Sequence, residues 1–150
     1  MTQQLDATYY RTGLLLGLVR GEEVHRWAEG IIEREPDPSR ELLDLILIPS
    51  TDLSALRHAL WPLSVEPEPA EVIKAMFGLL HADLTEGVRA TDDTVTVLRQ
   101  MRSMLRLPPS IYANLNEALV SHGLAKATGG TIGEWLEQFA GAKEALFRAS

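Results

Sequence analysis

The sequence predicts an all-α fold of about eight helices packed as antiparallel αα-hairpins, either as a closed helical bundle or as a short α-solenoid-like array. Apolar residues recur at intervals of three and four along most of the chain, which is the spacing of amphipathic helices. No segment shows sustained alternation of apolar and polar residues between turn signals, so no sheet is expected. Turn residues interrupt the helical pattern often, and short connections favour antiparallel neighbours.

Four helices are predicted in the first half of the chain, at residues 7–20, 22–35, 39–48 and 52–61. The second of them has the clearest apolar stripe, formed by Val24, Trp27, Ala28, Ile31 and Ile32. The boundaries are marked by capping and proline residues at Asp37-Pro38-Ser39, at Pro49-Ser50-Thr51-Asp52 and at Pro62.

Glycines recur every fourth residue at Gly13, Gly17 and Gly21. Each glycine costs a helix about 1 kcal/mol relative to alanine, so their common register calls for an explanation. We expect close helix–helix approach along that face, within the chain or against a second copy of it.

Four further helices are predicted in the second half, at residues 69–86, 92–106, 109–123 and 132–147. Three breaks separate them from one another and from the first half. These are Glu66-Pro67-Glu68-Pro69, Pro108-Pro109-Ser110, and the Gly129-Gly130 loop, which precedes a capping box of Thr131 and Glu134.

The length of 150 residues predicts a single all-α domain over 1–150. A chain of this size buries roughly two-thirds of its unfolded surface and needs no metal or disulfide to fold. Gly13-Leu14-Leu15 is echoed by Gly78-Leu79-Leu80, and Pro49-Ser50 by Pro109-Ser110. The echo permits a pseudo-duplication with its joint near 64–69, although chance similarity among amphipathic helices is the favoured explanation.

Composition restricts the classes of function. The absence of cysteine excludes thiolate metal sites and a cysteine nucleophile, and it fits a reducing compartment. The longest apolar run near the N-terminus, at 14–19, is too short for a membrane span or a signal peptide, so we expect a soluble, cytoplasmic protein with no membrane partner. The net charge is −7, so the chain as a whole lacks the excess of basic residues that nucleic-acid binders use to contact phosphates. A nucleic-acid partner is therefore not favoured.

No catalytic motif is recognised, and no metal or cofactor is predicted. Glu22 and His25 form one Glu-x-x-His pair of the kind that di-iron bundles use, but no other histidine has an acid three places before it. His81 and His122 each lie beside an apolar stripe. Either of them could serve as the base of a pocket, but a histidine at the edge of the core is the commoner arrangement.

Two charged patterns and one aromatic residue are candidates for contacting a partner protein, although solvated faces explain such charges as well. The acids of the second predicted helix would attract a basic partner. Arginines spaced three and four apart in the helix 92–106 would bind carboxylates or phosphates. Trp61, beside Pro62 at a helix end, is a candidate anchor. The charged candidates are Glu22, Glu23, Glu29, Glu33, Arg99, Arg102 and Arg106.

The first half resembles small all-α bacterial immunity-type proteins that accompany secreted toxins. The resemblance is carried by the runs Gly13-Leu14-Leu15-Leu16-Gly17-Leu18-Val19, Glu23-Val24-His25-Arg26-Trp27-Ala28-Glu29 and Leu42-Leu43-Asp44-Leu45. It implies a cytoplasmic helical protein that neutralises a toxin by occluding its active site, and it assigns no role to any residue.

The sequence therefore favours a non-enzymatic protein-binding role, with immunity to a basic toxin domain as its sharpest form. One alternative is a helical bundle that binds a small ligand, or acts as an enzyme, through a pocket containing His81 or His122. A second alternative is a nucleic-acid-associated regulator. A homodimer is compatible with each of these functions.

Overall fold

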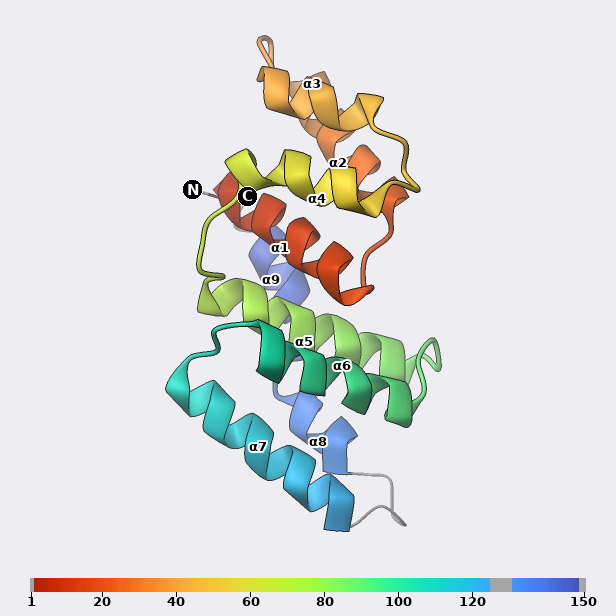
Figure 1. Cartoon of the computed structure of the whole chain (residues 1–150), viewed down its shortest axis with the longest axis vertical. Coiled ribbons are helices and arrows are strands. Elements are labelled where there is room, and N and C mark those ends of the chain that lie inside the picture. Colours follow the sequence, from red (N-terminus) through yellow and green to blue (C-terminus); the bar gives the residue numbers. More distant parts are fainter. Residues whose placement is uncertain (1, 125–130, 149–150) are drawn as a thin grey trace. The chain divides into compact units, whose positions relative to one another are not determined.

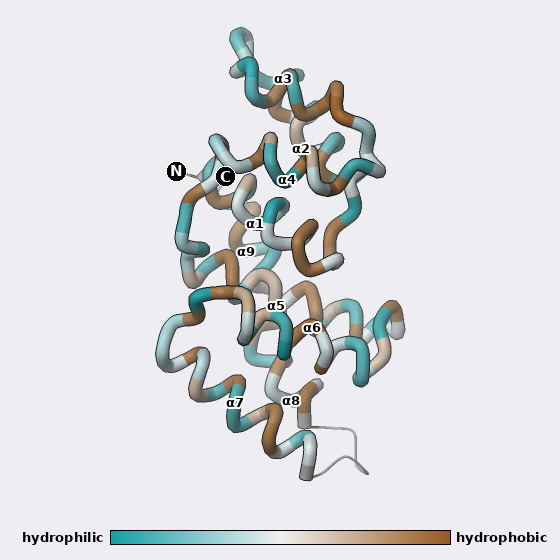
Figure 2. Tube along the Cα trace, viewed as in Figure 1, coloured by the Kyte–Doolittle hydropathy of each residue, from teal (hydrophilic) through white to brown (hydrophobic). Residues whose placement is uncertain are grey.

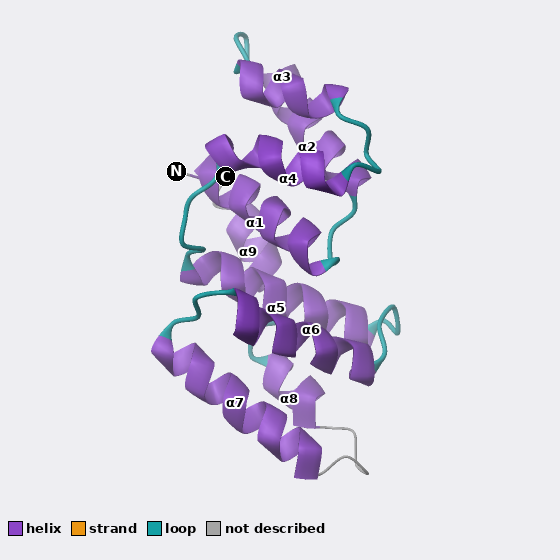
Figure 3. Ribbon diagram, in the orientation of Figure 1, coloured by secondary structure: helices purple, strands orange, loops and turns teal. Residues whose placement is uncertain are grey.

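The computed structural model describes residues 2–124 and 131–148, and all regular secondary structure in these ranges is helical (Figures 1 and 3). The predicted all-α class is confirmed. The chain folds into two compact units, which meet in the sequence between Glu66 and Pro67. This boundary lies within the proline-rich joint that the sequence singles out. No helix in the described ranges combines the length and apolarity needed to cross a membrane.

In its described residues, the first unit contains four α-helices and a 3-10 helix: α1 (Thr2–Leu16), α2 (Gly21–Arg34), α3 (Arg40–Leu47), α4 (Leu53–Leu60) and η1 (Trp61–Leu63). Helix α2 packs against α3, α3 against α4, and α4 against α1, while η1 lies on α1 and α4. Val24 and Ala28 on α2, Leu42 and Leu45 on α3, and Leu56 on α4 are fully buried. The apolar stripe predicted for the second helix therefore faces the core of this unit.

Side-chain caps fix where α3 and α4 begin. The Ser39 hydroxyl accepts a hydrogen bond from the Leu42 N–H, and the Asp52 carboxylate accepts one from the Ala55 N–H at 3.1 Å. A cap of this kind satisfies a backbone donor that the first helical turn leaves without a partner. The predicted break at 49–52 is thereby confirmed.

The three glycines in register do not form one helical face, and the expectation that they would is wrong. Helix α1 ends at Leu16, before the predicted end at residue 20, because Gly17 takes the left-handed conformation with φ of 73°. The Leu18 N–H then donates to the Gly13 carbonyl at 2.8 Å, which closes a Schellman-type end. Gly21 instead opens α2 and lies against the turn between α3 and α4, where a Cβ atom would overlap the Ser50 carbonyl.

The second unit consists of α5 (Ala70–Thr85), α6 (Thr91–Met104), α7 (Pro109–Leu124), α8 (Thr131–Glu137) and α9 (Ala142–Arg148). Helix α5 packs against α6, α8 and α9, while α7 packs against α6 and α8. Apolar positions recur along α5 (Figure 2), and Ile73, Met76, Phe77 and Leu80 are fully buried. Helix α5 therefore supplies the central apolar surface of this unit.

The last predicted helix, 132–147, is two helices, so its prediction as one is wrong. The chain leaves α8 after Glu137 and starts α9 at Ala142, with Gly141 at φ of 81° between them. This turn approaches α5 so closely that a Cβ atom on Gly78 would lie 2.7 Å from the Phe139 carbonyl oxygen. A continuous helix would lose this close packing of the turn on α5.

Candidate protein-binding surface

The acidic candidates lie on the hairpin formed by α2 and α3. Gly21, Val24, Ala28 and Ile31 are buried along one side of α2. At 100° per residue, positions spaced four, three and four apart fall together on the opposite side. That exposed stripe consists of Glu22, Arg26, Glu29 and Glu33.

Glu23 differs from the other predicted acids. Its carboxylate accepts a hydrogen bond from the Arg20 backbone N–H at 2.7 Å, at the start of α2, and the side chain is half-buried. It is therefore a helix-capping group. Glu22, Glu29 and Glu33 remain exposed, as a surface for contacting a partner requires.

The hairpin carries an excess of negative charge. Residues 21–47 contain eight acids and three arginines, a net charge of −5. In the described ranges, no ion pair joins any of these carboxylates to a basic side chain. The unpaired carboxylates produce a negative potential that attracts cations and basic proteins.

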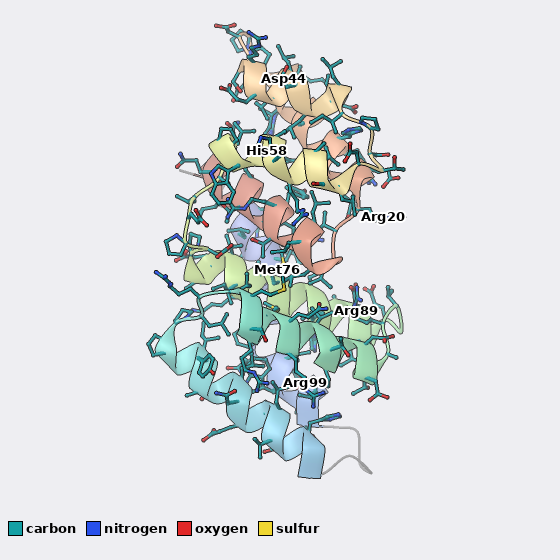
Figure 4. All side chains as sticks on the ribbon, viewed as in Figure 1. Arg20, Asp44, His58, Met76, Arg89 and Arg99 are labelled. Atoms are coloured by element: carbon teal, nitrogen blue, oxygen red, sulfur yellow. The ribbon has the colours of Figure 1, made fainter. Side chains whose placement is uncertain are left out.

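Two leucines on α3 face outward, and neither is among the candidates predicted from the sequence. Leu43 is 39% exposed and Leu47 is 79% exposed, and residues four apart are neighbours on a helix surface. Exposed Asp44 lies on the same helix (Figure 4). The sequence could have indicated their exposure, because both leucines lie outside the apolar stripe of Leu42 and Leu45 that packs α3 against the core.

Trp61 is 52% exposed, as expected for a residue at a helix end. Its ring also packs against Arg11, whose guanidinium carbon lies 4.6 Å from the ring centroid. Trp27, which lies on the predicted apolar stripe, packs against Tyr10 with ring centroids 5.3 Å apart. Trp61 thus has a structural contact as well as an accessible surface.

The three arginines of the predicted stripe have different environments. Arg102 is half-buried and donates to the Asn116 side-chain oxygen at 2.9 Å, which ties α6 to α7. Arg99 is exposed on α6, whereas Arg106 follows the end of the helix at Met104, short of the predicted end at 106. Of these three arginines, Arg99 and Arg106 are exposed, but they do not lie on the same helix.

The histidines take separate structural positions. His25 Nε2 lies 2.7 Å from the Ile48 carbonyl oxygen and donates to it across the hairpin. His122 is 6% exposed, and its Nδ1 has no hydrogen-bond partner in the described ranges, while His81 is half-buried. The described side chains include no group of three His, Cys, Asp or Glu residues arranged to hold a metal ion.

The Gly129-Gly130 loop and the Thr131 side chain, and with them the predicted capping box, lie outside what the structure describes. Comparison of the chain with protein-family models, with curated proteins and with solved structures finds no match.

Proposed function

We propose that this protein acts by binding another protein, and that the partner presents a basic surface to the α2–α3 hairpin. The observation that carries the proposal is the combination on α3 of outward-facing Leu43 and Leu47 with exposed, unpaired acids on the same hairpin. The carboxylates increase the rate of association with a basic partner. The leucines add affinity because their apolar surface is removed from water when the partner binds.

Immunity to a toxin is the specific form of this role that we propose. An inhibitor of a basic enzyme needs a rigid scaffold, an acidic face for fast association and a few apolar anchors. The buried core beneath α2 and α3 provides the rigid scaffold. The exposed acids and leucines of the hairpin provide the acidic face and the apolar anchors. The resemblance of the first half to immunity-type proteins points the same way.

The test is capture of the partner with surface variants. Tagged wild-type protein is incubated at moderate salt with lysate of its source organism, beside the double variant Leu43→Ser/Leu47→Ser. Val120→Ser is the matched control, because Val120 is 62% exposed and lies on α7. We expect one stoichiometric basic protein that is retained by the control, lost from the double variant and released by added salt.

Co-expression then tests immunity. If the captured protein is toxic to cells, the wild type is expected to restore growth and the double variant to fail. A partner bound equally by the double variant, an acidic partner, or self-association alone would contradict the proposed role of the hairpin.

A further inference from the structure

An open surface cavity of about 380 Å³ lies between α7 and α8, and four of its six lining residues are exposed. Its lining is formed by Asn114, Glu117, Ala118, Ser121, Trp135 and Gln138. The volume falls in the range of roughly 300–1,000 Å³ that small-molecule sites occupy. Neither His81 nor His122 belongs to this lining, so the cavity differs from the histidine pocket considered from the sequence.

Helix α7 supplies a polar wall. The four lining residues of α7 follow one another at helical spacing, which places them on one face of the helix: Asn114, Glu117, Ala118 and Ser121. Within the described ranges, no hydrogen bond or ion pair engages the side chains of Asn114, Glu117 or Ser121. Ala118 is buried, and its short side chain leaves room between the two helices.

Trp135 supplies an aromatic wall that is already ordered. Its ring makes edge contacts with Phe77, at a centroid distance of 5.1 Å, and with Phe139, at 5.2 Å. The Gln138 amide nitrogen donates to the Trp135 carbonyl at 2.9 Å, which leaves the amide oxygen as an acceptor. A ligand therefore meets an indole that needs little further ordering, and this lowers the entropy cost of binding.

We propose that this cavity binds a small organic cation of the alkylguanidinium class. Glu117 is the one charged side chain among the six lining residues, and an ionised carboxylate only accepts hydrogen bonds. The indole attracts a cation to its face. A guanidinium ion matches both, because its planar array of N–H donors pairs with carboxylate and amide oxygens while its face stacks on an aromatic ring.

This site is separate from the acidic hairpin and does not depend on the proposed protein-binding role. An anion is disfavoured because Glu117 repels it and none of the six described lining residues carries a positive charge. An alkylammonium ion offers fewer donors and no planar face, so it is expected to bind more weakly than the guanidinium compound.

The test follows the indole N–H signals of the full-length, ¹⁵N-labelled protein by nuclear magnetic resonance. The chain contains three tryptophans, Trp27, Trp61 and Trp135, and the variants Trp27→Phe and Trp61→Phe assign the Trp135 signal by elimination. Butylguanidinium is the probe, and butylurea is its neutral counterpart of similar shape. We expect butylguanidinium to shift the Trp135 signal saturably, with a Kd on the order of 1 mM, and butylurea to leave it unchanged.

Two charge-neutralising variants locate the effect. Glu117→Gln is expected to weaken binding of butylguanidinium by about tenfold or more, since it removes the charge-assisted hydrogen bond. Glu137→Gln is the matched control, because Glu137 is an exposed acid of α8 that does not line the cavity, and it is expected to retain binding. Both positions are exposed, and the indole spectrum reports directly whether each variant is folded.

The proposal is overturned if butylguanidinium leaves the Trp135 signal unmoved, or if butylurea moves it equally. It is also overturned if Glu117→Gln binds as well as the wild type, or if Glu137→Gln loses as much affinity as Glu117→Gln. In the last case the attraction would be a property of the net charge rather than of the cavity.

Discussion

The guanidinium of Arg11 stacks on the ring of Trp61, with its central carbon 4.6 Å from the ring centroid. The same group donates hydrogen bonds to the Ser64 hydroxyl and to the Val65 carbonyl. The Val65 N–H in turn donates to the Thr8 hydroxyl at 2.9 Å. Helix α1 thereby holds both η1 and the segment that follows it.

Replacing Arg11 by alanine is expected to lower the free energy of unfolding by about 2 kcal/mol. The stacked pair and the two hydrogen bonds each contribute about 0.5–1 kcal/mol, which together gives this magnitude. Urea denaturation measures the change. Arg26→Ala, at an exposed position of α2, is the control and is expected to change stability by less than about 0.5 kcal/mol. Equal effects of the two variants would contradict this assignment.

Two glycines of α2 are expected to respond in opposite directions to alanine. Gly21→Ala forces the backbone of α2 away from the Ser50 carbonyl, and overpacking of this kind typically costs about 1–3 kcal/mol. A Cβ atom on Gly30 meets no atom within 4 Å, so Gly30→Ala is expected to stabilise the helix by about 0.5–1 kcal/mol. Thermal and urea unfolding of both variants compare them directly. A stabilising Gly21→Ala would show that the turn at Ser50 does not press on α2.

The two arginines of α6 are expected to differ in their contribution to stability. Arg102→Ala removes the hydrogen bond to Asn116 and is expected to lower the free energy of unfolding by about 1–2 kcal/mol. Arg99→Ala is expected to have an effect near zero, since Arg99 is exposed. Urea denaturation again provides the measurement. If both variants lower the free energy of unfolding equally, the hydrogen bond between Arg102 and Asn116 makes no net contribution to stability.

Stability is expected to fall at alkaline pH through Tyr10. Burial, followed by the nearby charges of Glu23 and Asp6, raises the pKa of Tyr10 from 10.0 to about 12. The folded state therefore holds the phenol proton more tightly than the unfolded state. The resulting stabilisation is fully present below pH 10 and is lost as the pH rises toward 12.

The Tyr10→Phe variant measures this contribution. It preserves the ring contacts with Tyr9 and Trp27 but has no phenol to ionise. Unfolding free energies measured between pH 9 and pH 12 are expected to fall more steeply for the wild type, by about 1–2 kcal/mol in total after allowance for solvent screening. Parallel curves for the two proteins would remove Tyr10 as the cause.

Local patterns were sufficient to predict the helical class and most helix boundaries. The stripe containing Val24 and Ala28 is buried as expected, and Asp52 caps α4, because periodicity and capping involve residues that are close together in the sequence. The end of α1 was missed although its cause is local, since Gly17 takes a positive φ, whereas the error in the last predicted helix involves a contact between distant residues. The break between α8 and α9 brings the Phe139 carbonyl close to Gly78, and no local pattern contains that contact.

The candidate sites were less predictable than the fold. Exposed acids such as Glu29 and Glu33 were identified correctly as surface residues, but sequence spacing did not distinguish the capping Glu23 from them. Arg102 fell in the same helical register as Arg99, yet its environment is set by Asn116 on the next helix. The cavity beside Trp135 requires α7 and α8 to be placed side by side, so it could not be inferred from either helix alone.

A divergent relative that keeps the turn between α8 and α9 against α5 needs glycine at the position of Gly78, because any side chain there meets the Phe139 carbonyl. Leucine and valine stripes can be aligned with one another in several frames, since similar residues recur every three or four positions. Gly78, by contrast, can be aligned only with a glycine that occupies the same position against the turn. It is therefore a fixed point for aligning sequences in which few other identities survive.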